Sequence, residues 1–165
     1  MHKIIVTGPG SSGKSTLCKA LSKYFNIPFC KEYAREYLDA LNRGYNQDDL
    51  LKIAKGQLQA ENGIQLLDTD LVTLKVWSKY KYGSCDNWIL TQIEKHKLEN
   101  RFYLLCKPDI PWEKDPQREN PNDREELFEI YKKEIASLGH DYFIVEGGGR
   151  IEKSISKISP LISLI

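Results

Sequence analysis

The sequence predicts a three-layer α/β fold in which helices flank a five-stranded parallel sheet on both faces. A β-branched run at residues 3–7 enters the glycine-rich loop GPGSSGKST at residues 8–16, and apolar residues at helical spacing follow that loop. Four further apolar runs come later, each after a helical pattern. Strands that alternate with helices pair in parallel through crossovers, so this order indicates a sheet covered on both sides. A strand, a loop of this composition and a helix in succession indicate the P-loop NTPase class.

Five apolar runs are expected to form the strands. The second run has Pro28 near its beginning, where a strand tolerates proline, and the third closes on the carboxylate of Asp68. The expected strands cover residues 3–7, 27–31, 64–68, 101–106 and 142–146.

Apolar residues three and four positions apart predict the helices between these strands. Asn46 is a suitable N-cap, Gly63 ends the helix that it opens, and Asp123 with Glu126 matches a capping box. A polar, proline-rich stretch predicts a lid-like loop at about residues 107–123. Three helices are expected to begin near residue 14, after Asn46 and at residue 151. The other expected helices cover residues 34–42, 71–79, 88–98 and 124–138, with a loop at 80–86.

Length and composition fit one domain that spans residues 1–165. The net charge of +1 predicts no general attraction to nucleic acid or to anionic membranes. The first strand begins at residue 3, which leaves no room for a signal peptide, and four cysteines without C-x-x-C spacing suit reduced thiols. We therefore expect a cytoplasmic protein, whose oligomeric state its sequence does not indicate. The histidines lack metal-ligand spacing and are expected on the surface: His2, His96 and His140.

The glycine-rich loop completes the phosphate-binding pattern G-x-x-x-x-G-K-[ST]. Gly8 and Gly13 permit a backbone that turns successive N–H groups toward a polyphosphate. Lys14 is expected to reach the β- and γ-phosphates of ATP, and the Ser15 hydroxyl to ligate Mg²⁺. Thr16 most simply continues the helix. The predicted nucleotide-binding residues are Gly8, Pro9, Gly10, Ser11, Ser12, Gly13, Lys14, Ser15 and Thr16.

Three carboxylates follow the expected strands at the edge where open α/β sheets bind ligands. Asp68 is positioned to hold Mg²⁺ with its water shell, in the Walker-B manner. Glu32 or Asp70 could accept a proton from an acceptor hydroxyl or orient that hydroxyl. The alternatives are a solvated Glu32, a structural Asp68, and an Asp70 that only caps the next helix.

Two arginines and a group of aromatic residues complete the candidates. Arg118 and Arg124, in and just after the proline-rich loop, could close over the transferring phosphoryl group, or could be ordinary surface charges. Core packing is the favoured interpretation of the aromatic group, although its faces could also stack on a planar or cationic ring. That group comprises Trp77, Tyr80, Tyr82, Trp88 and Trp112.

Several strings resemble the ribosylnicotinamide kinase domain of the bacterial NadR-type NAD-biosynthesis regulators. They are GPGSSGKSTL, KEYAREYL, LLDTDLVTLKVWSKYKYG, YLLCKPDIPWEKDPQRENPNDREELF and YFIVEGGG, which together span nearly the whole chain. The resemblance implies a nucleoside-kinase-like P-loop fold that uses ATP to phosphorylate the 5′-hydroxyl of nicotinamide riboside, giving nicotinamide mononucleotide. It also favours functional roles for Asp68, Arg118 and Arg124.

Two departures from that family pattern bear on function. The sequence contains no nucleotidyltransferase or DNA-binding unit, so a stand-alone kinase is expected. Gly10 stands where such proteins often carry a glutamate, which removes a charge beside the phosphates. The alternatives to a nicotinamide riboside kinase are a kinase for another nucleoside, a nucleotide-dependent switch, and a metabolite sensor without catalysis.

Overall fold

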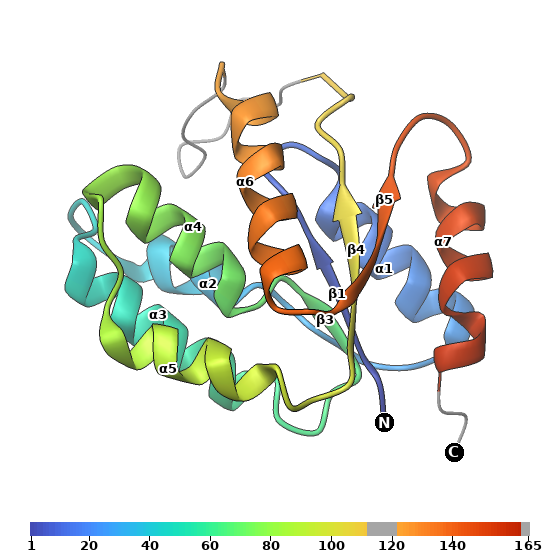
Figure 1. The fold of residues 1–165 in the computed structure, drawn as a ribbon, viewed down its shortest axis with the longest axis horizontal. Coiled ribbons are helices and arrows are strands. Elements are labelled where there is room, and N and C mark those ends of the chain that lie inside the picture. Colours follow the sequence, from blue (N-terminus) through green and yellow to red (C-terminus); the bar gives the residue numbers. More distant parts are fainter. Residues whose placement is uncertain (112–121, 163–165) are drawn as a thin grey trace.

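A five-stranded, all-parallel sheet forms the centre of the molecule, in the order β2-β3-β1-β4-β5 (Figure 1). The computed structural model describes residues 1–111 and 122–162. Val6 of β1 pairs with Asp68 on one side and Leu104 on the other, so β1, β3 and β4 end at one edge. The strands are β1 Lys3–Thr7, β2 Phe29–Cys30, β3 Leu66–Asp68, β4 Arg101–Cys106 and β5 Asp141–Val145.

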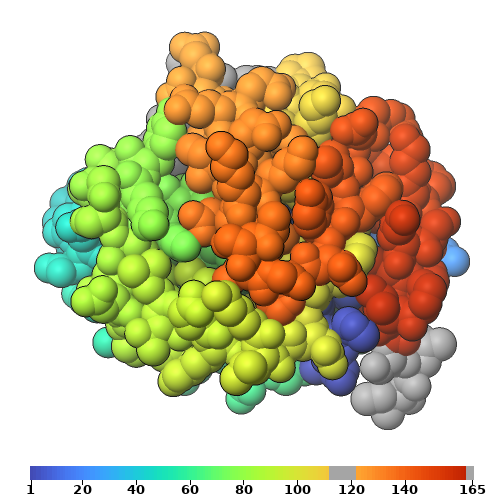
Figure 2. Space-filling view, in the orientation of Figure 1, coloured from blue at the N-terminus to red at the C-terminus, as the bar shows by residue number. Residues whose placement is uncertain are grey.

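Helices cover both faces of this sheet, which confirms the predicted three-layer α/β class. The side chain of Ile5 packs into a core beneath α2 to α6, whereas Ile4 and Val6 pack into a second core with α1 and α7. Figure 2 shows α5, α6 and α7 next to one another across one face of the molecule. The helices are α1 Lys14–Phe25, α2 Tyr33–Ala40, α3 Gln47–Ala60, α4 Leu71–Tyr82, α5 Asn87–His96, α6 Arg124–Ser137 and α7 Arg150–Ile158, followed by a 3₁₀ turn at Ser159–Leu161.

Several predicted boundaries need correction. The second and third strands are shorter than the apolar runs that predicted them. Helix α4 continues through residues 80–82, expected as loop, and ends only where Gly83 adopts a left-handed φ of 77°. The predicted N-cap at Asn46 is confirmed and forms a capping box with Asp49, but Asp123 makes no side-chain cap. Glu126, its expected partner, instead accepts a hydrogen bond from the Tyr80 hydroxyl at 3.0 Å.

Buried polar groups differ in part from expectation. His96 is only 3% exposed, so its expected surface position is wrong. The four cysteines are free thiols, and burial raises their pKa values.

No helix in the described part of the chain has both the length and the apolar character needed to cross a bilayer. Most of the expected lid-like loop, at residues 112–121, lies outside the described residues.

Candidate active site

The phosphate loop joins β1 to α1, and two of its glycines have conformations that other residues rarely adopt. Gly8 has a φ of 138°, and a Cβ there would lie 2.6 Å from the Cys106 carbonyl oxygen on β4. Gly13 has a φ of 85° at the N-cap of α1. The loop therefore packs against the end of the neighbouring strand because Gly8 has no side chain. Within the loop, the Ser12 hydroxyl donates to the Pro9 carbonyl at 2.7 Å.

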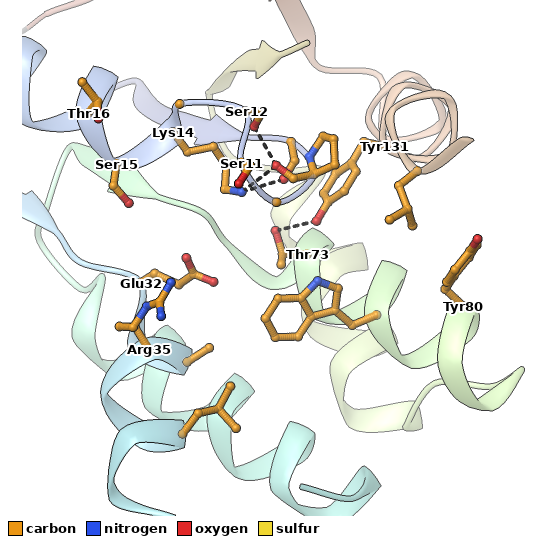
Figure 3. Close-up of a pocket in the computed structure, with 18 of the residues that line it drawn as sticks. Ser11, Ser12, Lys14, Ser15, Thr16, Glu32, Arg35, Thr73, Tyr80 and Tyr131 are labelled. Carbon is orange, nitrogen blue, oxygen red and sulfur yellow. Dashed lines mark hydrogen bonds between the residues drawn. The ribbon is translucent and has the colours of Figure 1, made fainter. Parts of the chain in front are cut away.

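The Lys14 side chain curls back into this loop. Its Nζ donates to the carbonyls of Gly8 at 2.9 Å and Pro9 at 3.0 Å (Figure 3). The ammonium is thus held inside the loop by backbone oxygens. A cation placed there, beside the positive end of α1, favours a polyphosphate.

Ser15, the second residue of α1, lies next to Asp68, the last residue of β3. The Ser15 hydroxyl donates to Asp68 Oδ2 at 2.9 Å. Asp68 Oδ1 is buried and has no hydrogen-bond partner. Burial raises the pKa of the Asp68 carboxyl, while the Lys14 ammonium and the Ser15 hydroxyl act in the opposite direction.

The oxygen donors of this pair suit Mg²⁺. Magnesium commonly takes one or two protein oxygens and keeps several waters, so it needs no dense cluster of ligands. Among the described residues no group of three or more His, Cys, Asp or Glu side chains could hold a metal ion. The orphaned oxygen of Asp68, next to a hydroxyl at the start of α1, fits a hydrated magnesium ion bound to a nucleotide.

A continuous pocket extends from the phosphate loop between α2, α4 and α6. One end consists of the loop itself, and the other is walled by aromatic and aliphatic side chains. Figure 3 shows Glu32 and Arg35 of the α2 side lying across the cavity from Tyr131. Beyond the loop, residues 8–16, the lining residues are Glu32, Ala34, Arg35, Leu38, Tyr45, Thr73, Trp77, Tyr80, Lys81, Ile110, Leu127 and Tyr131.

Glu32 is held at the junction between β2 and α2. It is the N-cap residue of α2, yet its side chain makes no capping hydrogen bond and extends into the pocket. The next backbone N–H, that of Tyr33, donates to Gln57 Oε1 of α3 at 3.0 Å. Gly56 leaves the space that the Tyr33 ring occupies, because a Cβ there would lie 2.1 Å from that ring. Packing between α2 and α3 therefore fixes the start of α2, from which the Glu32 side chain extends.

The far end of the pocket is aromatic and also carries a cation. Tyr45, Trp77 and Tyr80 line it, and the Lys81 ammonium lies 3.9 Å from the centre of the Tyr45 ring. Trp77 and Tyr80 also pack against the hydrophobic core, which confirms core packing for these two side chains. Stacking of their faces on a ligand ring stays a prediction. Tyr82 and Trp88 pack on the core without lining the pocket, and Trp112 lies outside the described residues.

Asp70 does not line the pocket. Its Oδ1 caps α4 by accepting the Val72 N–H at 3.1 Å. Its Oδ2 accepts from Arg101 Nη1 at 2.9 Å and from the Tyr103 hydroxyl at 2.6 Å, all buried beneath α4. The contacts of Asp70 therefore favour the alternative interpretation, in which it caps a helix and forms a buried ion pair, over a contact with the acceptor hydroxyl. Arg101, 31 positions along the chain, determines that placement.

Of the two predicted arginines, Arg124 lies at the phosphate loop. Its Nη1 donates to the carbonyls of Ser11 at 3.1 Å and Ile110 at 2.9 Å. Arg118 lies outside the described residues. Sequence reasoning missed Arg150, whose Nη1 donates to the Ser12 carbonyl at 2.8 Å. A basic residue directly after the three glycines that follow β5 was the available signal.

Fold and loop together define a P-loop NTPase domain. The chain belongs to the AAA domain family, whose model matches residues 3–153. Among curated proteins it resembles the trifunctional NAD biosynthesis/regulator protein NadR of Escherichia coli (strain K12), with 28% identity over 131 residues. The NadR protein of Salmonella typhimurium (strain LT2) is 26% identical over 129 residues. Each alignment covers 72% of this chain but only 31% of the relative.

Solved structures agree with this likeness. A crystal structure of NadR in complex with NR matches with a TM-score of 0.79 and 26% identity, over 99% of this chain and 53% of that one. Deoxyadenosine kinase from M. mycoides matches with a TM-score of 0.63 and 17% identity, over 97% of this chain and 100% of that one, and shares the fold alone. The resemblance drawn from the sequence motifs is therefore confirmed.

Proposed function

We propose that this domain is an ATP-dependent kinase that transfers the γ-phosphoryl group of ATP to the 5′-hydroxyl of nicotinamide riboside, forming nicotinamide mononucleotide and ADP. The observation that carries the proposal is the continuous pocket, which joins the phosphate loop to an aromatic end past the Glu32 carboxylate. The loop end suits the donor phosphates, and the aromatic end suits the planar nicotinamide ring of the riboside. The match to NadR in complex with NR supports nicotinamide riboside as the acceptor.

The phosphate loop is proposed to hold the ATP phosphates. Lys14 would exchange its loop carbonyls, those of Gly8 and Pro9, for phosphate oxygens. Ser15 and Asp68 would hold Mg²⁺, which neutralises phosphate charge when it is bound. Thr16 is exposed on α1 and is among the residues that line the pocket, so it keeps its predicted place in the nucleotide-binding set.

Glu32 is proposed to receive the acceptor proton. In the transfer, the 5′-oxygen forms a bond to the γ-phosphorus while the bond from that phosphorus to the ADP oxygen breaks, and the hydroxyl proton passes to Glu32. Phosphoryl transfer depends mainly on positioning and charge stabilisation, so the carboxylate orients the hydroxyl as well as taking its proton. Arg124 lies close enough to the loop to stabilise charge on the transferring group. Arg118 keeps the same predicted role.

A panel of ribosides tests the proposed acceptor. The protein is incubated with ATP, Mg²⁺ and, separately, nicotinamide riboside, adenosine, guanosine, cytidine, uridine or the deoxynucleosides, and each phosphorylated product is quantified. We expect kcat/KM to be highest for nicotinamide riboside. If the folded protein instead prefers another nucleoside, that nucleoside replaces nicotinamide riboside as the proposed acceptor, and the proposed reaction class is retained. The variant Lys14→Ala, which lacks the phosphate-loop cation, is the blank for contaminating kinases.

A further inference from the structure

Two arginines reach the phosphate loop from matching places in the fold. Arg124 is the first residue of α6 and Arg150 the first residue of α7. Arg124 donates to the Ser11 carbonyl at 3.1 Å, and Arg150 donates to the next carbonyl, that of Ser12, at 2.8 Å. Consecutive peptide groups of the loop are therefore each bound by a guanidinium from outside.

A hydrogen bond to a loop carbonyl also orients the following amide. In a trans peptide unit the C=O and the next N–H point in opposite directions. The Arg150 bond to the Ser12 carbonyl therefore turns the Gly13 N–H away from Arg150 and toward the inside of the loop. Arg150 is also close to Gly13, since a Cβ there would lie 3.6 Å from its Nη1. Inward N–H groups are what a phosphate-binding loop requires.

Asp109 holds Arg150 in this position. Its Oδ1 forms an ion pair with Arg150 Nη2, which also donates to the Lys107 carbonyl at 2.8 Å. Asp109 Oδ2 accepts the Gly147 backbone N–H at 2.7 Å. The side chains of Arg150 and Asp109 are 17% and 29% exposed, so water screens the pair only in part. The turn after β5 and the segment after β4 are thereby tied to the loop.

We propose that Arg150 and Asp109 are positioning residues for nucleotide binding, which keep the Ser12–Gly13 peptide in its phosphate-binding orientation. The inference rests on the proposed function only in that the loop must bind a nucleotide. It concerns the donor end of the pocket, because Arg150 contacts the phosphate loop at Ser12 and neither residue is among those that line the pocket. A planar guanidinium can reach the Ser12 carbonyl, the Lys107 carbonyl and the Asp109 carboxylate together, whereas a lysine ammonium cannot match that geometry.

The test is calorimetric titration of the whole chain with ATP and Mg²⁺ in the absence of any riboside. Four variants are compared with wild type: Arg150→Gln, Asp109→Asn, the double variant and Arg150→Lys. Lys157→Gln is the matched control, since it removes a cation from the same helix, where Lys157 lies over the Phe143 ring. Thermal unfolding of each variant reports whether the fold persists.

Each single substitution should raise the Kd for ATP about tenfold, the usual consequence of losing a charged hydrogen bond. The double variant should be no weaker than the worse single variant, because both act on one peptide. Arg150→Lys should resemble Arg150→Gln, and the KM for the riboside should stay within about twofold of wild type. Lys157→Gln should bind ATP as wild type does.

Three results would overturn the proposal: an unchanged Kd in Arg150→Gln, full recovery in Arg150→Lys, or additive losses in the double variant. A purely structural role would also count against it. That role is indicated if Arg150→Gln lowers both the unfolding midpoint and the ATP affinity, while Asp109→Asn shows no selective loss of ATP binding. If wild type binds ATP but phosphorylates no riboside, the proposed kinase function fails. The ATP titrations would still decide the roles of Arg150 and Asp109.

Discussion

The Ser15 hydroxyl donates a hydrogen bond to the Asp68 carboxylate at 2.9 Å, although the two residues are 53 positions apart. The parallel pairing of β1 with β3 brings them together, since Val6 and Asp68 are register partners. One oxygen of Asp68 is thus engaged, and the other is buried without a partner. This pair is the part of the site that most specifically suits a magnesium-bound nucleotide.

Replacing Asp68 by Asn should remove most of the benefit that Mg²⁺ brings to ATP binding. An amide keeps the Ser15 contact but carries no negative charge for the cation. We expect ATP affinity measured with Mg²⁺ to fall about tenfold or more, toward the value measured with EDTA. Titrations in both conditions provide the comparison, with the exposed Asp48→Asn on α3 as control. A variant with undiminished Mg²⁺ dependence would show that Asp68 is only structural.

Replacing Glu32 by Gln should lower kcat for riboside phosphorylation about 100-fold, while the Kd for ATP stays near that of wild type. The amide preserves shape but cannot take a proton. Steady-state kinetics at saturating riboside, together with ATP titration, separates the two effects. Glu36→Gln, one turn further along α2 and exposed, is the control. Equal kcat values for wild type and Glu32→Gln would disprove the proposed proton acceptor.

Asp70→Asn should affect stability rather than chemistry. The substitution leaves the buried Arg101 guanidinium with less compensating charge, a change that commonly costs about 3 kcal/mol or more of unfolding free energy. Urea unfolding measures that loss, and kcat of the folded fraction should be near wild type. A stable variant with a large loss of kcat would return Asp70 to the candidate catalytic residues.

Burial of His96 should make the protein less stable in mild acid. Desolvation, followed by the Arg101 charge, lowers the pKa of His96 to about 4, whereas an unfolded chain binds that proton near pH 6.5. Between these values the unfolded state holds more protons, so unfolding free energy rises with pH, by at most about 1.4 kcal/mol per pH unit from this group. The contribution of His96 to the unfolding free energy is fully present above pH 6.5 and is lost as the pH falls toward 4.

Urea unfolding at pH 5 and pH 7 checks this effect. The difference between the two pH values should be larger for wild type than for His96→Asn, which cannot titrate. His140→Asn is the control, because His140 is partly exposed and contacts the His96 backbone carbonyl rather than its ring. An identical pH dependence in wild type and His96→Asn would contradict the assignment.

The phosphate loop and the sheet could be predicted because their signals are local. The glycine offsets around Lys14 and the strand that ends on Asp68 each lie within a few residues of sequence. Asp70 shows the limit, since its partners Arg101 and Tyr103 lie on a strand more than 30 positions away. No local pattern distinguishes a carboxylate in the site from one beneath a helix.

The role of Arg150 was missed and the position of His96 was wrongly predicted for the same reason. Arg150 is a single basic residue after a glycine turn, and its role depends on Ser12, 138 positions away. His96 was expected on the surface, but tertiary packing buries it. The capping-box pattern at Asp123 was local and still wrong, because Tyr80 of α4 engages Glu126.

The kinase assignment is tested most directly by comparing the amounts of ADP and nicotinamide mononucleotide formed in one reaction. Purified protein is supplied with ATP and Mg²⁺, with and without nicotinamide riboside, and both products are quantified chromatographically. A riboside kinase should form one ADP for each mononucleotide, and little ADP when the riboside is omitted. Rapid ADP release without riboside, and no mononucleotide with it, would contradict the kinase assignment and favour a nucleotide-dependent switch.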